Sequence, residues 1–401
     1  MKQYIVGPET ARMLQLGHPW VLADRYTRKW PKTKAGELGA LVDDKNQFLA
    51  TALLDPDDRI VARILAYRQI SLDVEWLTTR VRAAVDLRTQ HTLLDETDAY
   101  RLINGEGDGL PGLTVDRYGD YLMIQLYSQA WSPYLPLLVK VLRHQLQPQG
   151  IYRKRRPQET RQLEAKRSDK AYSELCWGEA APVPLVVREN GLSFHVDLRQ
   201  GLNTGIFPDQ RRHRQDLMAR AKGKRVLNLF AFTGAFSVAA AVAGARQVTS
   251  VDVSATYLQQ AQDNFALNRL NPRQHEFIVG DVFKELARLR KDKRIFDVIL
   301  FDPPSFSTTR NSRFSTQRGT SRLVAETLPL LSDGGLLISS SNHQKTDMTA
   351  YLKELRRGSL EAGCELRTIF RSSQPEDFPC PVTFPEGNYL KYVISVKAQR
   401  I

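Results

Sequence analysis

From about Pro184 to the C-terminus, short apolar runs alternate with segments of helical character. Five of these runs have the length and composition of buried strands: 224–230, 247–252, 276–281, 296–301 and 336–341. Helical segments are expected at 235–243, 254–268 and 321–331. Strands that alternate with helices predict an α/β fold with a parallel sheet covered on both faces. Such a sheet brings the carboxyl ends of its strands to one edge, where ligands bind.

The run 296–301 ends in a segment that is chemically unusual. Asp302 follows the last apolar residue, and Pro303 and Pro304 come next. Because proline has no N–H and restricts the residue before it, the chain must leave the strand extended with its carbonyls unpaired. With the flat ring of Phe306, this segment could hold the edge and face of a planar base. The alternative is an ordinary turn, capped by Asp302, in which Phe306 fills the core.

The three preceding strand ends carry related signals. Gly234 lies in a loop before a helix, where backbone can approach a ligand. Asp252 comes 18 residues later and can accept hydrogen bonds from two ribose hydroxyls. The third strand ends at Asp281 and Val282, which suit an adenine amine and backbone contacts. One acid at a strand end is usually a cap. Three in succession, Asp252, Asp281 and Asp302, predict a nucleoside-like ligand.

The length and the pattern of the 401-residue chain predict three domains. Residues 1–73 are β-rich and predict a small barrel, with a hairpin turn at 43–46. Residues 74–183 predict a central α/β domain that opens with a helix, and residues 184–401 form the domain with the parallel sheet. The glycines between 105 and 112 resemble a phosphate loop, but no helix follows them, so a tight hairpin before the strand 121–126 is favoured.

The net charge of +13 and the pI of about 9.6 favour a polyanionic partner. The most basic tract begins with Arg153, Lys154, Arg155 and Arg156. It is either a solvated face or an arm that neutralises RNA phosphates, and charge alone leaves both alternatives open.

The cysteines indicate the compartment. Cys176, Cys364 and Cys380 are odd in number and widely spaced, which fits neither a disulfide framework nor a metal site. No run of 18 apolar residues and no export leader is evident, so we expect a cytoplasmic protein without a metal and without a membrane partner.

Several motifs together resemble a known family. They are His18-Pro-Trp20, the segment 101–117, Thr204-Gly205, Asp209-Gln210-Arg211, Asp302-Pro-Pro and Phe384-Pro-Glu-Gly-Asn-Tyr-Leu-Lys391. Over nearly the whole length they look like the bacterial 23S ribosomal RNA methyltransferase I family, within the class I S-adenosylmethionine-dependent methyltransferases. The resemblance implies an N-terminal PUA RNA-binding domain, a central α/β domain and a Rossmann-like catalytic domain. It places the cofactor S-adenosylmethionine on Phe207, Asp209, Asn228, Phe230, Thr233, Gly234, Asp252, Asp281 and Val282.

One position departs from this family. Cytosine-C5 methylation needs a thiolate that adds to the ring, and the family carries that cysteine after the fifth strand. Here the segment reads Ser340-Ser341-Asn342-His343, with Asn342 where the thiol is expected. The region is similar instead to the guanine-N7 half of the bifunctional 23S rRNA K/L enzyme. Ring nitrogens carry an in-plane lone pair, so positioning the base suffices.

These observations give the main hypothesis and its alternatives. We expect an enzyme that methylates a base of 23S rRNA, such as guanine N7, with Asp302, Pro303, Phe306 and Asn342 holding the base. One alternative is cytosine-C5 methylation that uses Cys380. Others are a non-catalytic RNA-binding or assembly factor, and an enzyme that methylates a small molecule or a protein. Association into a homodimer is left open.

Overall fold

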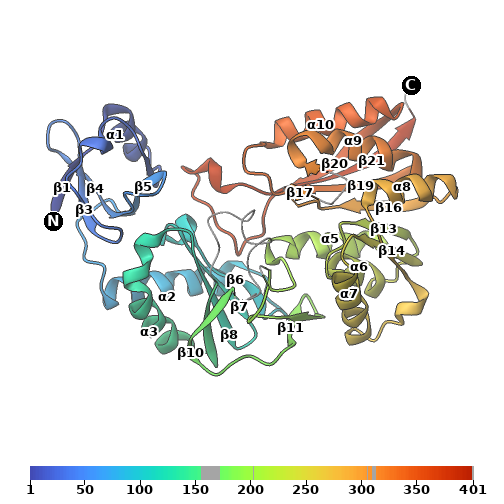
Figure 1. The fold of residues 1–401 in the computed structure, drawn as a ribbon, viewed down its shortest axis with the longest axis horizontal. Coiled ribbons are helices and arrows are strands. Elements are labelled where there is room, and N and C mark those ends of the chain that lie inside the picture. Colours follow the sequence, from blue (N-terminus) through green and yellow to red (C-terminus); the bar gives the residue numbers. More distant parts are fainter. Residues whose placement is uncertain (155–171, 202, 305, 309–312, 400–401) are drawn as a thin grey trace. The chain divides into compact units, whose positions relative to one another are not determined.

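The computed structural model describes residues 1–154, 172–201, 203–304, 306–308 and 313–399, with only the backbone at 306–308 and 313–318. The chain forms two compact units. The first comprises residues 1–187, 196–204 and 376–387, and the second comprises 188–195, 205–375 and 388–401. In Figure 1 the second unit is drawn in green to red, except for the red segment 376–387, which belongs to the first unit.

The first unit begins with a small five-stranded sheet. Its strands are β1 (Lys2–Ile5), β2 (Trp20–Leu22), β3 (Leu38–Val42), β4 (Phe48–Leu54) and β5 (Ile60–Ala66), in the order β1-β3-β4-β5-β2. Helix α1 (Pro8–Gln15) buries Ala11 and Leu14 in the core of this sheet. The predicted hairpin joins β3 to β4, with Asn46 at a φ of 60° in the turn.

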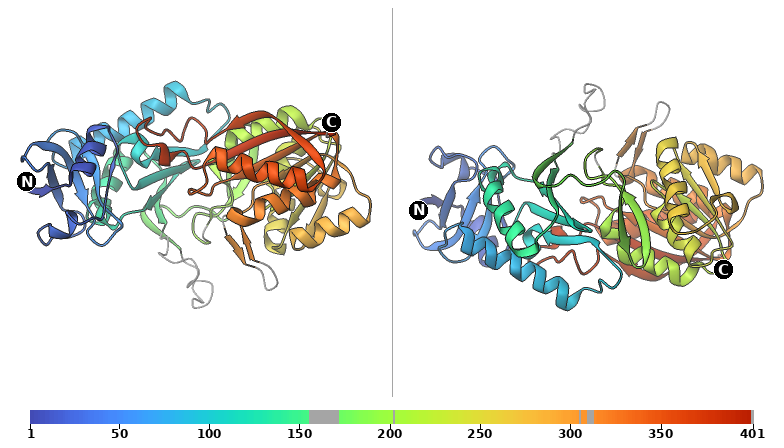
Figure 2. Two further views of the ribbon diagram at one scale, coloured as in Figure 1. Left: turned by 90° about the horizontal axis from the view of Figure 1, so that it is seen from above. Right: turned by 90° about the horizontal axis from the view of Figure 1, so that it is seen from below.

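A second five-stranded sheet completes the first unit. Its members are β6 (Ala99–Asn104), β7 (Leu113–Tyr118), β8 (Tyr121–Leu126), β9 (Gly150–Lys154) and β10 (Ser173–Gly178), and the helices are α2 (Val74–His91) and α3 (Leu135–Leu146). All neighbouring pairs are antiparallel except β8 and β9. Figure 2 shows α2 and α3 beside each other. Leu53 and Leu65 of the first sheet lie in the same core cluster as these helices.

The glycine-rich segment joins β6 to β7 in a hairpin, as expected, but through a 3-10 turn at Gly105–Asp108 and into the strand Leu113–Tyr118 instead of directly into 121–126; it also receives a segment from far along the chain. Residues 376–387 return to the first unit, where the buried Asp377 carboxylate accepts the Arg101 N–H at 2.9 Å. The Asn104 amide donates to the Pro379 carbonyl at 2.9 Å. A Cβ on Gly107 would lie 1.9 Å from that carbonyl oxygen, so the glycine is needed for backbone-to-backbone packing.

The second unit is the α/β domain that the alternating pattern predicts. Its seven-stranded sheet has the order β15-β14-β13-β16-β19-β21-β20. The strands are β13 (Arg225–Leu229), β14 (Gln247–Asp252), β15 (Glu276–Val279), β16 (Phe296–Phe301), β19 (Leu331–Ser341), β20 (Cys364–Ser372) and β21 (Lys391–Gln399). The first five strands are parallel, and β21 runs antiparallel to both β19 and β20.

Helices cover both faces of this sheet (Figure 1). They are α5 (Arg211–Ala221), α6 (Ala235–Val242) and α7 (Ala255–Leu267), which pack in series, and α8 (Val282–Lys291), α9 (Thr316–Thr327) and α10 (Met348–Glu361), which do the same. Two short hairpins, β11 (Leu185–Glu189) with β12 (Leu192–Val196) and β17 (Phe306–Thr308) with β18 (Arg313–Ser315), complete the description.

The strand register determines where the site lies. Leu229 pairs with both Val251 and Phe301, and Phe301 pairs with Ser339. The carboxyl ends of β14, β13, β16 and β19 therefore lie side by side. Most bounds differ from the prediction by a residue or two, as for β13 and β15, but β19 begins at Leu331, five residues early, and α9 spans Thr316–Thr327 instead of 321–331. In the part of the chain that the structure describes, no helix has the length and apolar character to span a bilayer.

Candidate functional site

The loop after β13 has an unusual backbone. Phe230 and Phe232 have φ values of 58° and 51°, a region that bulky residues rarely adopt. The loop is fixed to the next strand, because the Ala231 N–H donates to the Val251 carbonyl at 3.0 Å. Strain that is held in place by neighbouring structure is typical of functional loops.

Gly234 ends this loop, for a reason that the sequence did not give. Its φ is 74°, and a Cβ would lie 2.6 Å from the Cβ of Ala261 on α7. The glycine therefore permits close packing of α6 against α7. Thr233 is also fixed, because its hydroxyl donates to the Gly205 carbonyl at 2.5 Å and its own carbonyl accepts the Asn264 amide.

Two of the predicted carboxylates are held by nearby backbone N–H groups. Asp252 accepts from Phe232 at one oxygen and from Ser254 at the other, both at 2.9 Å. Asp281 is the N-cap of α8. One of its carboxylate oxygens accepts from the backbone N–H groups of Phe283 and Lys284, at 3.1 and 3.3 Å. Val282 behind it is buried.

Aromatic rings stand next to Asp252. The Phe207 ring is 40% exposed and lies 5.3 Å from that of Phe232, which in turn lies 4.5 Å from the Tyr257 ring. Burial, and then the charge of Asp252, raise the pKa of Tyr257. Tyr257 was missing from the predicted set, whereas Phe232 lies in the loop 228–234 that the resemblance assigns to the cofactor. The sequence signal for Tyr257 is an aromatic residue five positions after Asp252.

Asp209 and Phe207 are held by two groups that the sequence did not single out. The Tyr389 hydroxyl donates to Asp209 at 2.8 Å. Arg214 Nη2 donates to the Phe207 carbonyl at 2.8 Å, and Nε and Nη2 donate to the two oxygens of the buried Glu189 carboxylate at 2.6 Å each. This buried, bidentate ion pair fixes the position of the Phe207 backbone.

Asp302 is held by side chains from distant parts of the domain. The Gln210 amide nitrogen donates to its carboxylate at 2.8 Å and to the Ser340 hydroxyl at 2.9 Å. Burial, and then the nearby charge of Asp209, raise the pKa of Asp302 to about 6. Hydrogen bonds from Ser340 and Gln210 and the charge of Arg214 act in the opposite direction. Pro303 is buried behind the carboxylate.

In the segment after β19, Asn342 is exposed to solvent and His343, the next residue, is buried. The His343 ring lies 2.9 Å from the Thr346 hydroxyl, and the Lys391 ammonium donates to the carbonyls of His343 and Tyr389 at 2.7 Å each. Burial lowers the pKa of Lys391 to about 8. Lys391 therefore fixes the backbone next to Asn342 from inside the domain.

The other predicted residues have different surroundings. The Asn228 amide donates to Ser237 at 2.9 Å inside the domain, so its side chain is already engaged in packing. In the first unit, Arg153 is partly exposed and Lys154 is buried. Arg155, Arg156 and the side chain of Phe306 lie outside the described residues.

None of the three cysteines forms a disulfide in the part of the chain that the structure describes. The Cys380 thiol donates to the Phe384 carbonyl at 3.0 Å, and burial, followed by the charges of Glu106 and Glu386, raises its pKa. Burial also raises the pKa of Cys364. A raised pKa reduces the thiolate fraction, which is the reactive form of the residue.

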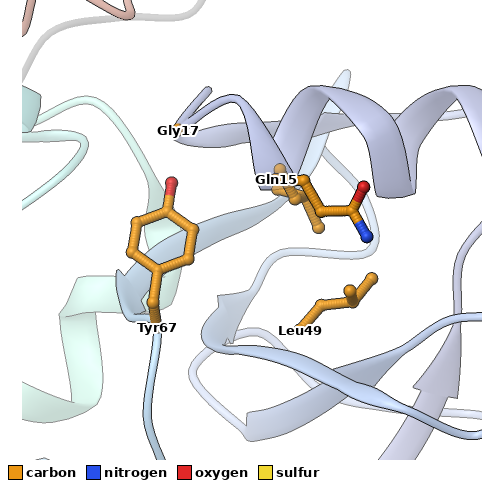
Figure 3. Close-up of a pocket in the computed structure, with 5 residues that line it drawn as sticks. Gln15, Gly17, Leu49 and Tyr67 are labelled. Atoms are coloured by element: carbon orange, nitrogen blue, oxygen red, sulfur yellow. The ribbon is translucent and has the colours of Figure 1, made fainter.

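A separate hollow lies in the first unit, beside the end of α1. It has a volume of about 310 Å³ and is lined by Leu14, Gln15, Gly17, Leu49 and Tyr67 (Figure 3). It contains none of the predicted site residues.

Comparisons with known proteins place this site among methyltransferases. A family model described as S-adenosylmethionine-dependent methyltransferase matches residues 100–384, and a PUA-like domain model matches residues 5–67. The ribosomal RNA large subunit methyltransferase I of Erwinia tasmaniensis is 35% identical over 93% of this chain and 94% of its own length. The protein of the same name from Yersinia pseudotuberculosis is also 35% identical, over the same shares.

Solved structures agree. A protein described as a methyltransferase, which was crystallised with SAH, has a TM-score of 0.89 at 30% identity and covers 99% of this chain and 100% of its own. A structure from Streptococcus mutans described as SAM-dependent has a TM-score of 0.86 at the same identity and coverage.

Proposed function

The chain belongs to the ribosomal RNA large subunit methyltransferase I family and is an S-adenosylmethionine-dependent methyltransferase, and we propose that it methylates a base of 23S ribosomal RNA without a covalent enzyme–base intermediate. The observation that carries this proposal is the pair of side chains at the ends of β16 and β19. These are Asp302 and Asn342, and neither is a nucleophilic thiol.

The residues at the ends of β13, β14 and β15 fit the cofactor, which supplies an electrophilic methyl group. Asp252 offers carboxylate oxygens to a ribose diol, as acids at this strand end do in nucleotide-binding α/β folds. The partly exposed Phe207 ring and the neighbouring Phe232 and Tyr257 rings offer apolar faces to a purine. Asp281 lies beside the third strand end, where it can accept from an exocyclic amine.

The acceptor base is proposed to lie against Asp302, Pro303 and Asn342. The carboxylate accepts a hydrogen bond from an N–H on the edge of the base, while the Asn342 amide can donate or accept. The Phe306 ring is proposed to stack on the base, which is worth about 1 to 3 kcal/mol. A ring nitrogen such as guanine N7 then needs only alignment with the methyl group.

The surroundings of Cys380 argue against the covalent alternative. Cytosine-C5 methylation needs a thiolate, whereas Glu106 and Glu386 disfavour a negative charge on this sulfur. Cys380 also donates its proton to a carbonyl of its own segment.

RNA binding is proposed for the PUA-like domain and for the tract 153–156. The net charge of +13 gives the attraction to phosphates that this requires. The three free cysteines fit a reducing compartment, so we infer that the protein acts in the cytoplasm.

The test is methylation of rRNA by the purified protein with isotopically labelled S-adenosylmethionine, followed by mass spectrometry of the nucleosides. We expect label in a purine methylated at a ring nitrogen, and we expect Cys380→Ser to leave the rate unchanged. Label in 5-methylcytidine that is lost in Cys380→Ser would establish the covalent alternative. Cofactor binding with no transfer to rRNA, free or assembled, would favour an assembly factor.

A further inference from the structure

We propose that Gln210 and His213 are positioning residues that hold the Asp302 carboxylate in the orientation in which it accepts a hydrogen bond from the base. The inference rests on the proposed function of Asp302 and assigns roles to two residues that are not among the predicted site residues.

The two residues lie one turn apart at the start of α5. Gln210 is the N-cap residue of this helix and His213 is its third residue, so their side chains project from the same face. Both are almost completely buried, with 3% and 1% of their surface exposed. A buried amide is costly unless its polar atoms are paired, and both ends of the Gln210 amide are paired; the His213 ring is paired at Nδ1, while its Nε2 has no hydrogen-bond partner among the described residues.

The hydrogen bonds determine which way the Gln210 amide points. Its nitrogen lies near two acceptors, the Asp302 carboxylate and the Ser340 hydroxyl, and its oxygen lies 2.5 Å from Nδ1 of His213. With the amide in this orientation its oxygen can only accept, so Nδ1 of His213 carries the proton. A rotated amide would direct its oxygen at the Asp302 carboxylate, which disfavours that orientation while Asp302 is ionised.

The His213 ring is itself held in place. It stacks on the Tyr392 ring of β21 with a centroid separation of 3.9 Å and an interplanar angle of 0°. Tyr392 is buried, and its hydroxyl donates to Asp216 at 3.3 Å. Burial, and then the charge of Arg214, lower the pKa of His213 to about 3, opposed by the backbone of Ser373. The ring is therefore neutral over the working range and serves as a fixed donor.

The result is a chain of fixed groups from β21 to the acceptor side. Tyr392 orients His213, His213 orients Gln210, and Gln210 directs an N–H toward Asp302. The charged or titratable groups that act on Asp302 besides this chain are Asp209, Arg214 and Tyr351. Burial and the charge of Asp209 raise the pKa of Asp302, and the hydrogen bond from Gln210 lowers it. Removal of the Gln210 donor should therefore raise the pKa of Asp302.

The test compares His213→Phe with His213→Asn. Phenylalanine keeps the ring that stacks on Tyr392 but has no donor, whereas the Asn amide nitrogen takes the place of Nδ1. We expect His213→Phe to lower kcat for rRNA methylation about tenfold, the loss typical of a slightly misplaced catalytic group. The acid limb of the pH–rate profile should move to higher pH, with the Kd for S-adenosylmethionine unchanged. His213→Asn should restore most of kcat.

A second variant and a second measurement separate this proposal from the proposed function. In protein labelled with ¹³C at Asp Cγ, with Asp302→Asn identifying the signal, Gln210→Met should raise the pKa of Asp302 whether or not the protein methylates RNA. An unchanged Asp302 titration in Gln210→Met overturns the positioning role. So does a kcat loss in His213→Phe that His213→Asn fails to restore. An absence of rRNA methylation in the wild type, with the titration shift present, would refute the proposed substrate and leave the positioning role standing.

Discussion

The two halves of the strand-end site hold their carboxylates by different means. On the side that we propose for the cofactor, at the ends of β13, β14 and β15, Asp252 and Asp281 accept from backbone N–H groups, mostly of residues two or three positions away. On the side that we propose for the acceptor base, at the ends of β16 and β19, Asp302 is held by the side chain of Gln210, 92 residues away. The first arrangement is a property of local turns. The second exists only when several elements are packed together.

This difference has a chemical consequence. The acceptor-side carboxylate is the one whose pKa burial raises to about 6, so its charge can change near neutral pH. Burial of a group that accepts a hydrogen bond from a base strengthens that bond, because hydrogen bonds are stronger where water is excluded. The comparison can be tested by disturbing each half separately.

The largest effect is expected on the acceptor side. Asp302→Asn replaces the acceptor by an amide whose NH₂ group competes with the Gln210 donor, so we expect kcat to fall at least about 100-fold. Binding of S-adenosylmethionine, measured by calorimetry, should be unchanged. Asp333→Asn is the matched control, because that side chain is 63% exposed, lies away from the strand-end site, and among the described residues contacts only Lys397 and, at 3.4 Å, the Gln399 amide as polar partners. Full activity in Asp302→Asn would end its assignment to the acceptor side.

The next effect is expected on the cofactor side. Asp252→Ala removes charged hydrogen bonds, each worth about 1.5 to 3 kcal/mol, so the Kd for S-adenosylmethionine should rise about 10- to 100-fold. Asp263→Ala, on the exposed face of α7, provides the control. Unaltered binding of S-adenosylmethionine to Asp252→Ala would contradict the proposal that the ends of β13, β14 and β15 bind the cofactor.

The two halves should also differ in their response to pH. Because the pKa of Asp302 is raised to about 6, kcat should fall about tenfold per pH unit below 6 and remain level from 7 to 8. The folding stability should change with pH in the opposite direction to kcat. A carboxyl with a raised pKa stabilises the fold when protonated, so the Tm of the wild type relative to Asp302→Asn should decrease as pH rises through 6. A pH-independent difference in Tm would argue that Asp302 is not buried in this way.

The smallest effect is expected at Cys380. Its hydroxyl replacement can donate to the same Phe384 carbonyl, so Cys380→Ser should leave kcat within about twofold of the wild type, below 0.5 kcal/mol in barrier height. A loss of several orders of magnitude would instead identify a nucleophile and reverse the interpretation of Asn342.

Much of the fold was readable from local patterns. The alternation of apolar runs and helices predicted the parallel sheet, and the acids at three successive strand ends predicted the edge where the site lies. The hairpin at Asn46 and the hairpin that contains Gly107 were also predicted, because turn residues act within a few positions. The roles of Gly107 and Gly234 were not, since Pro379 and Ala261, which require them to be glycine, are distant in sequence.

By itself the sequence indicated the family and the sheet, and it supplied the carboxylates that we propose for the cofactor, because each depends on a motif, a periodicity or residues that are adjacent in the chain. Only the tertiary structure decided how Asp302 is held. Gln210, His213, Ser340 and Tyr392 come from different elements, and the low exposure that raises the pKa of Asp302 is a property of their packing. Hydrogen bonds between buried side chains that are distant in the chain produce no regular sequence pattern. They can be identified only in the folded structure.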